Sequence, residues 1–259
     1  MRLFLLIIIS SLFVFSNCEN VQKPTSVVLV TMTPVQSKNC IDTICAEINL
    51  SYPILSGGSN PTAVQAINDS ILSIVYLSID GDPTVPLPNA YHTACLDLLN
   101  MLEEELANDP NYPFSYVIEL NTTLLFQNNK VVSFEMSNYS FTGGAHGNYG
   151  SALNTFLLDS GKSVQLSDIV KDTIELRSML EKMFVETKNA EIGEQLTLEE
   201  LVFPECIPLP LPMQWCIVKD GLRVTYNPYE VAPYVVGQTD PVVTWEQLKG
   251  LVDRDDWLE

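Results

Sequence analysis

The residues best suited to chemistry in this sequence lie in a glycine-rich stretch near its middle. His146 stands in the run Gly143, Gly144, Ala145, His146 and Gly147, where the glycines permit backbone conformations that other residues avoid. Such a stretch can bring the chain close to a ligand and place the imidazole in a binding pocket. It can equally form a tight β-turn in which the histidine hydrogen-bonds the backbone of its own loop. The sequence leaves both interpretations open.

A second block of candidate binding residues lies toward the C-terminus. Tyr229, Glu230 and Tyr234 fall in a segment that Pro228 and Pro233 make rigid and extended. Its aromatic side chains either contact a ligand or pack against the protein, and the sequence does not decide between these roles.

The common catalytic patterns are missing from the sequence. A nucleophilic triad would need His92 or His146 as its base, and no Gly-x-Ser-x-Gly elbow is present. Walker A, dinucleotide-binding and HExxH patterns are also absent. Two histidines exclude a His-rich metal centre, and no CxxC spacing indicates zinc. We therefore predict a protein that is not an enzyme and holds neither metal nor cofactor.

Composition narrows the possible partners. The 259 residues include 13 Lys and Arg against 32 Asp and Glu, a formal net charge of −19. Such a surface repels phosphate backbones, so we expect no nucleic acid partner and expect any charged partner to be basic. The alternative is that the acidity only confers solubility. Because 46% of the residues are hydrophobic and 17% are charged, a packed core is expected.

The N-terminus has the features of an export signal. Met1 and Arg2 precede an apolar stretch from Leu3 to Phe15, and Cys18 follows directly after Ser16 and Asn17. We predict a lipoprotein-type signal peptide over residues 1–17, lipidation of Cys18 and a tether over residues 18–26. The alternative is an ordinary cleaved signal with a chance cysteine. The expectation is an exported lipoprotein of the bacterial envelope, facing the periplasm or the cell surface, which contacts the membrane through its lipid anchor only.

The remaining cysteines fit an oxidising compartment. Cys40 and Cys45 bracket a short link, and Cys206 and Cys216 bracket a proline-rich one, so we predict two local disulfides. Cys95 lies within a helical apolar pattern and is expected to be a buried free thiol.

Hydrophobic periodicity predicts an α+β fold of antiparallel hairpins with packed helices. Strands are expected at Val27–Met32, Cys45–Tyr52, Phe114–Gln127, Lys130–Thr142, Asn154–Asp159, Gln214–Lys219 and Leu222–Tyr226. Helices are expected at Pro61–Ile79, around Cys95–Leu106, at Asp172–Lys188 and after a capping box that begins at Thr244.

Two blocks of the sequence resemble a known bacterial module. The run from Ser140 to Gly150, followed by Leu158-Asp-Ser-Gly-Lys162, resembles the DUF3298 family, and Tyr226 to Gly237 resembles its terminal strand. Upstream, Tyr52-Pro53 and Ala66-Ile-Asn68 resemble the companion DUF4163 region more weakly. The resemblance divides the chain into a DUF4163-like region at 27–142 and a DUF3298-like region at 143–259.

The resemblance implies a function in the bacterial envelope. The paired module occurs in extracytoplasmic proteins, including lysozyme-sensing anti-sigma factors and the N-terminal regions of peptidoglycan deacetylases, and it brings no established catalytic residues. We therefore expect a non-catalytic, lipid-anchored binding module that recognises a lysozyme-like cationic protein or a peptidoglycan-related ligand. The alternatives are a hydrolase of cell-wall glycan and a structural envelope protein without a small ligand.

Overall fold

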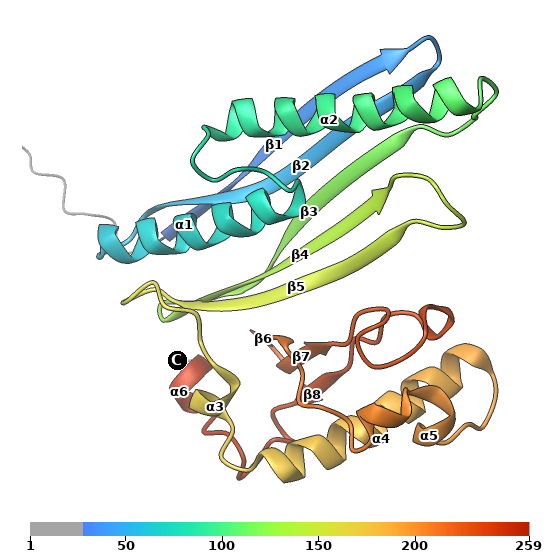
Figure 1. Cartoon of the computed structure of the whole chain (residues 1–259). Helices are drawn as coiled ribbons and strands as arrows, with labels where there is room; N and C mark the ends of the chain where they lie inside the picture. The colour runs from blue at the N-terminus through green and yellow to red at the C-terminus, as the bar shows by residue number, and fades with distance from the viewer. Residues whose placement is uncertain (1–27, 259) are drawn as a thin grey trace, which may run out of the picture.

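The computed structural model describes residues 28–258, so the expected signal peptide, Cys18 and the tether lie outside the described residues. The first half of the chain forms a five-stranded sheet in the order β1-β2-β3-β4-β5, with two helices on one face (Figure 1). All neighbouring strands are antiparallel except β2 and β3. The elements are β1 (Val28–Ile41), β2 (Ile44–Gly57), α1 (Pro61–Ser78), α2 (Leu87–Asn108), β3 (Tyr116–Gln127), β4 (Val131–Phe141) and β5 (Asn148–Leu157).

The parallel pair explains why the helices lie where they do. A parallel connection must cross from one end of the sheet to the other, and here α1 and α2 together make that crossing over one face. The first helix begins as the sequence predicts: the Asn60 side chain accepts hydrogen bonds from the backbone of Thr62 and Ala63 at 3.1 and 3.2 Å. Its apolar residues, including Ile67 and Ile71, are fully buried in the first core.

The second half forms a three-stranded sheet, in the order β6-β7-β8, that lies against β4 and β5 on the face opposite α1 and α2 (Figure 1). The long helix of this half packs on the outer side of the small sheet, where Phe184 meets Tyr226 edge to face. The elements are α3 (Leu166–Ile169), α4 (Thr173–Ile192), α5 (Leu198–Leu201), β6 (Gln214–Val218), β7 (Gly221–Thr225), β8 (Val242–Thr244) and α6 (Asp255–Leu258), with 3-10 turns at Pro204–Cys206 and Tyr234–Val236.

The predicted α+β class is confirmed. Several elements differ from the sequence-based expectation: β8, α3 and α5 were not expected, and α2 begins at Leu87, before the expected Cys95. β1 continues to Ile41 because it pairs with β2 along its whole length, whereas the apolar pattern ends near Met32. β5 begins at Asn148 because that residue pairs with Ser140. The capping hydrogen bonds between Thr244 and Gln247 form as expected but close only a turn, and the last helix begins at Asp255.

The strand order of the large sheet also indicates where the first half of the chain ends. β5 lies beyond residue 143, where the resemblance places the start of the second region, yet it is the edge strand of the first sheet. The buried residues of the first core accordingly extend to Leu158, and those of the second begin at Val164.

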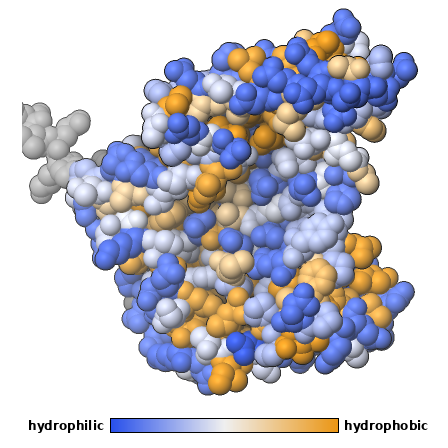
Figure 2. All heavy atoms as spheres, viewed as in Figure 1, coloured by the Kyte–Doolittle hydropathy of each residue, from blue (hydrophilic) through white to orange (hydrophobic). Residues whose placement is uncertain are grey.

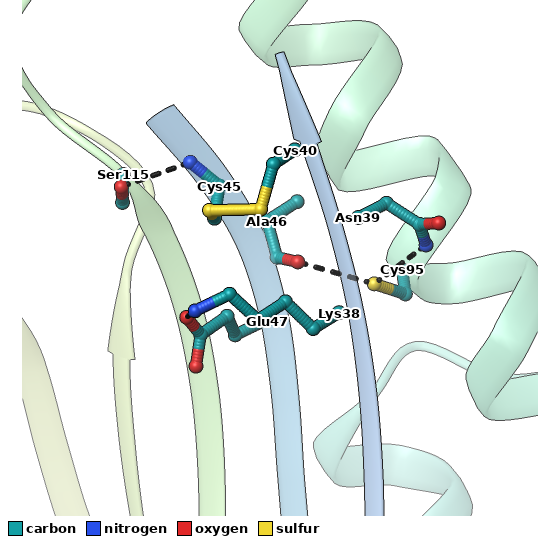
Figure 3. Close-up of a disulfide and its surroundings, with 8 residues drawn as sticks. All are labelled: Lys38, Asn39, Cys40, Cys45, Ala46, Glu47, Cys95 and Ser115. Atoms are coloured by element: carbon teal, nitrogen blue, oxygen red, sulfur yellow. Dashed lines mark hydrogen bonds and ion pairs between the residues drawn. A yellow bond between two sulfur atoms is a disulfide. The ribbon is translucent and has the colours of Figure 1, made fainter. Parts of the chain in front are cut away.

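The predicted disulfide between Cys40 and Cys45 is present and closes the turn between β1 and β2 (Figure 3). Cys95 is a buried free thiol, as predicted. Its sulfur accepts a hydrogen bond from the Asn39 side chain and donates one to the carbonyl of Ala46, both at 3.3 Å. The thiol therefore links α2 to the same end of the hairpin that the disulfide closes.

The predicted disulfide between Cys206 and Cys216 is wrong, because both residues are free thiols. Their sequence separation suggested a closed loop, but Cys206 lies in the 3-10 turn at Pro204–Cys206 and Cys216 lies within β6. Cys206 therefore faces the carbonyl of Glu230, while Cys216 is buried in the sheet.

The two sheets are joined by a partly buried ion pair. The Arg223 guanidinium on β7 donates to both carboxylate oxygens of Glu135 on β4, at 2.9 and 3.0 Å. Ser151 on β5 donates a third hydrogen bond to this carboxylate at 3.0 Å, and the side chains of Arg223 and Glu135 are 21% and 16% exposed. A bidentate pair with this little solvent exposure fixes the relative position of the sheets.

Removing one partner of this pair should destabilise the protein more than removing both. Arg223→Met leaves the Glu135 carboxylate partly buried with no cation, so we expect the free energy of unfolding to fall by about 2–3 kcal/mol. The double variant Glu135→Met with Arg223→Met should lose less than the sum of the single losses, as measured by urea unfolding. Strictly additive losses would contradict this role.

Thiol counting tests the cysteine assignment directly. Unfolded, unreduced protein with Cys18 blocked should expose three side-chain thiols, from Cys95, Cys206 and Cys216. A single thiol would mean that Cys206 and Cys216 are bridged in the native protein. Five would mean that the turn between β1 and β2 is reduced.

Candidate functional site

The glycine-rich run forms the turn between β4 and β5. Gly143 and Gly144 both adopt positive φ values, of 94° and 93°, which other residues rarely reach. Gly147 has a different reason to lack a side chain, because a Cβ atom there would collide with the ring of Tyr139. The turn thus uses its glycines for backbone conformation at one end and for close contact with an aromatic ring at the other.

The C-terminal block packs directly onto this turn. The Tyr234 hydroxyl donates a hydrogen bond to the carbonyl of Gly147 at 2.7 Å. The His146 ring stacks on the ring of Tyr234, with 3.9 Å between centroids and 17° between planes. His146 also lies 3.0 Å from the Gly147 carbonyl through its Nδ1 atom. Two segments separated by about eighty residues in the sequence therefore form one surface.

Tyr234 is the centre of a wider group of rings. Tyr149 packs edge to face against it at 5.7 Å between centroids, and Tyr229 lies at 5.5 Å. Tyr139, the cross-strand partner of Tyr149, covers Gly147. We call the five residues Tyr139, His146, Tyr149, Tyr229 and Tyr234 the aromatic cluster.

The aromatic cluster is accessible to solvent. Tyr139 and Tyr149 are each 38% exposed and Tyr229 is 57% exposed, whereas most large apolar side chains of the chain are buried. Val235, next to Tyr234, is 90% exposed. A contiguous exposed group of aromatic and apolar side chains is typical of a binding surface.

Tyr229 is held in an unfavourable backbone conformation. Its φ value is 66°, a region that non-glycine residues seldom occupy. The turn is maintained by the hydrogen bond from the Tyr229 amide to the carbonyl of Ala232 at 3.1 Å. The protein thus keeps a large exposed ring at a position where glycine would be favoured.

Glu230 has a different role from its aromatic neighbours. Its carboxylate accepts a hydrogen bond from the backbone of Asn227 at 3.0 Å and closes the turn. Burial raises its pKa, while the Asn227 hydrogen bond opposes that rise. The half-buried Glu230 is therefore a structural group of the turn.

The turn itself is fixed to the large sheet by Asn227. Its side-chain oxygen accepts from the amide of Ser151 at 2.7 Å, and its side-chain nitrogen donates to the carbonyl of Ser151 at 3.1 Å. This pair of bonds occupies the outer edge of β5 at Ser151, and Gln214 and Val164 bond the same edge further along, at Leu153 and Thr155. The aromatic cluster consequently rests on the sheet through backbone contacts at both Gly147 and Ser151.

Sequence reasoning located His146, Tyr229 and Tyr234 but missed Tyr139, Tyr149 and Val235. Tyr139 and Tyr149 stand opposite each other on β4 and β5, so their symmetric spacing about the glycine turn was an available signal. Nothing in the sequence distinguished Val235 from a core residue, because the 3-10 turn that exposes it depends on tertiary contacts.

The chemistry available to this surface is contact through ring faces and hydroxyl groups. Within residues 28–258, no three His, Cys, Asp or Glu side chains are placed to hold a metal ion.

Burial raises the pKa of the Cys216 thiol to about 12, which leaves it protonated at neutral pH. No helix in the same range is long and apolar enough to cross a membrane.

Comparison with known families assigns both halves of the chain. Residues 40–149 match the family described as "Deacetylase PdaC", in the region where the sequence analysis expected a DUF4163 resemblance. Residues 157–246 match the family described as "Protein of unknown function (DUF3298)". No curated protein matches the chain.

Two solved structures share the fold. A member of the DUF3298 family from Bacteroides fragilis superposes with a TM-score of 0.70 at 15% identity, covering 89% of this chain and 96% of that one. A DUF3298 family protein from Pseudomonas aeruginosa superposes with a TM-score of 0.55 at 16% identity, covering 88% and 95%. The chain therefore joins a region that matches the PdaC family to a region that matches the DUF3298 family, and it shares the fold of these two solved structures.

Proposed function

We propose that this protein is an exported, lipid-anchored and non-catalytic module of the bacterial envelope that binds a peptidoglycan-derived saccharide through its aromatic cluster. The observation that carries the proposal is the exposure of several tyrosine rings on one rigid surface, at 38% for Tyr149 and 57% for Tyr229. Saccharide rings offer apolar C–H faces bordered by hydroxyl groups. Tyrosine provides an apolar ring with a polar end, which suits both parts of such a ligand.

The rigidity of the surface supports this choice. Tyr234 and the glycine turn are joined by a hydrogen bond and a stacking contact, and Asn227 holds the neighbouring turn to β5. A surface that is already ordered loses little conformational entropy when it binds. Tyr229, which carries the most exposed ring of the aromatic cluster, also has a strained backbone conformation, as residues that contact ligands commonly do.

The position of the aromatic cluster also suits an anchored receptor. The turn between β4 and β5 lies at the same end of the large sheet as the turn between β1 and β2. The described chain begins at Val28, at the other end of β1. A lipid on Cys18 would therefore hold the aromatic cluster on the side of the protein away from the membrane.

We propose that the protein is not catalytic because of the groups that surround His146. Its contacts in the described chain are the Gly147 carbonyl and the Tyr234 ring, an arrangement that holds the imidazole without a carboxylate to orient it as a base. A hydrolase of cell-wall glycan and a purely structural envelope protein remain as outcomes of the experiment below.

A cationic protein such as lysozyme is the second candidate partner, and a separate observation favours it. Residues 39–129 contain no Lys or Arg but include eleven Asp and Glu. Part of this charge lies on α2, whose outward face is largely hydrophilic (Figure 2). An uncompensated acidic surface of this size attracts basic proteins over long distances.

Substitution of Tyr229 tests the saccharide proposal without unfolding the protein. Glycine fits the positive φ at this position, so Tyr229→Gly should keep or raise the unfolding midpoint. It should weaken sedimentation with purified insoluble peptidoglycan about tenfold, because the most exposed ring is lost. Leu77→Ala, at a side chain that is 81% exposed on α1, is the control and should bind as the wild type does.

Further readings of the same assay separate the alternatives. Release of new reducing ends from peptidoglycan would identify a hydrolase. Saturable lysozyme binding that survives physiological salt and exceeds polylysine binding, with no peptidoglycan binding, would replace the saccharide by the cationic protein. Absence of binding to either would leave the structural role and overturn the proposal.

Anchoring has its own test at Cys18. Produced in a bacterium with its own leader, the protein should partition with membranes, and Cys18→Ser should release it into the soluble fraction, because the acyl chains supply the membrane affinity. Mass spectrometry of the mature N-terminus should show an acylated cysteine. An unmodified N-terminus would contradict the anchor.

A further inference from the structure

A second surface that combines an aromatic ring with free polar groups surrounds Trp245. This residue follows β8 and lies beside the hairpin turn between β6 and β7, at Asp220 and Gly221. The aromatic cluster adjoins the other end of β7, where Tyr226 leads into the turn that carries Tyr229. The two surfaces are therefore separated by the length of the small sheet.

The Trp245 ring is held in place by the backbone of the hairpin. Its indole nitrogen donates to the carbonyl of Lys219 at 3.0 Å, and its amide donates to the carbonyl of Asp220 at 3.0 Å. The ring is still partly exposed to solvent. The ring packs in part against the second core, and its solvent-accessible part offers an apolar surface to a ligand, since the N–H group is already bonded.

Hollows adjoin Trp245 on two sides. One has a volume of about 900 Å³ and is bounded by Trp245, Phe126 and Leu258, with Lys219 and Arg254 at its wall. The other, of about 440 Å³, shares Trp245 and Arg254 and adds Lys249. Both volumes fall in the range of small-molecule sites.

The charged side chains around these hollows are not paired with one another. Lys219, Lys249 and Arg254 form no ion pair within the described chain. Glu246 borders both hollows, Asp220 borders the larger one, and Asp253 and Asp255 border the smaller one. Hydrogen-bond donors and acceptors therefore both line the hollows with nearly balanced charge, which does not favour a polyanion.

We infer that the Trp245 groove is a second saccharide-binding site, specific for a neutral sugar chain. The indole face would stack on the apolar face of one sugar ring. Its hydroxyl groups would then receive hydrogen bonds from Arg254 and Lys219 and donate to Glu246. A neutral ligand satisfies both kinds of charged group without leaving either one opposed by a like charge.

The place of the groove in the fold makes it distinct from the aromatic cluster. Phe126, at its wall, precedes Gln127, whose side chain donates to the carbonyl of Val28 at 2.7 Å. The groove thus lies where the described chain begins, at the opposite end of the large sheet from the β4–β5 turn. Two sites so placed would hold a polymer at two points and raise its overall affinity.

Calorimetric titration of the full mature protein with triacetylchitotriose, cellotriose and maltotriose, all of which are neutral, tests the inference. We expect saturable binding of at least one trisaccharide and a loss of at least about tenfold in affinity for Trp245→Ala. Arg254→Gln should reduce affinity by a smaller factor. Lys182→Gln, on the exposed side of α4, is the charge-matched control and should leave binding unchanged.

The same titration with Tyr229→Gly distinguishes this inference from the proposed function. Binding lost in Trp245→Ala but kept in Tyr229→Gly supports the groove, whatever the outcome with peptidoglycan. Binding lost only in Tyr229→Gly would assign the sugar to the aromatic cluster and overturn the inference. Failure of all three trisaccharides to bind the wild type would also overturn it. Urea unfolding of each variant shows whether it is folded.

Discussion

The hydrogen bonds between Asn227 and Ser151 are the contact on which the surface of this protein depends. One amide side chain satisfies the backbone of the β5 edge with both its donor and its acceptor, at 2.7 and 3.1 Å. This contact attaches the segment that carries Tyr229 and Tyr234 to the strand that carries Tyr149. It acts together with the hydrogen bond from Tyr234 to the Gly147 carbonyl, which joins the same segment to the glycine turn.

The ion pair between Arg223 and Glu135 lies between the two sheets and supports the same arrangement as this contact. Asn227 aligns the edge of the large sheet with the C-terminal segment, while the ion pair aligns the faces of the two sheets. Ser151 takes part in both, because its backbone bonds Asn227 and its hydroxyl bonds Glu135. A single residue of β5 therefore couples the packing of the core to the geometry of the surface, which explains why the two halves form one body.

Local patterns predicted much of this fold, and the errors came from long-range contacts. The cap at Asn60, the helix α4 and the Cys40–Cys45 bridge are properties of neighbouring residues, and each was predicted correctly. The length of β1 and the free thiols of Cys206 and Cys216 depend on partners distant in the sequence, and each was predicted wrongly. The candidate site shows the same division. Its residues had unusual local sequences, but only the tertiary structure brings His146 onto Tyr234 and separates Glu230 from the exposed rings.

The distribution of charge gives the two ends of the molecule different physical characters. Residues 39–129 include eleven Asp and Glu and no Lys or Arg, and in the described chain only Glu47 among these acids forms an ion pair, with Lys38 on β1. This layer of the protein therefore carries a negative field. Around Trp245, by contrast, the charge is close to balanced, because Lys219, Lys249 and Arg254 stand among Asp220, Glu246, Asp253 and Asp255. The aromatic cluster lies apart from that group of charged side chains. Recognition there must then rest on ring faces and hydrogen bonds, whereas long-range attraction of a basic protein would arise from the helix-bearing layer.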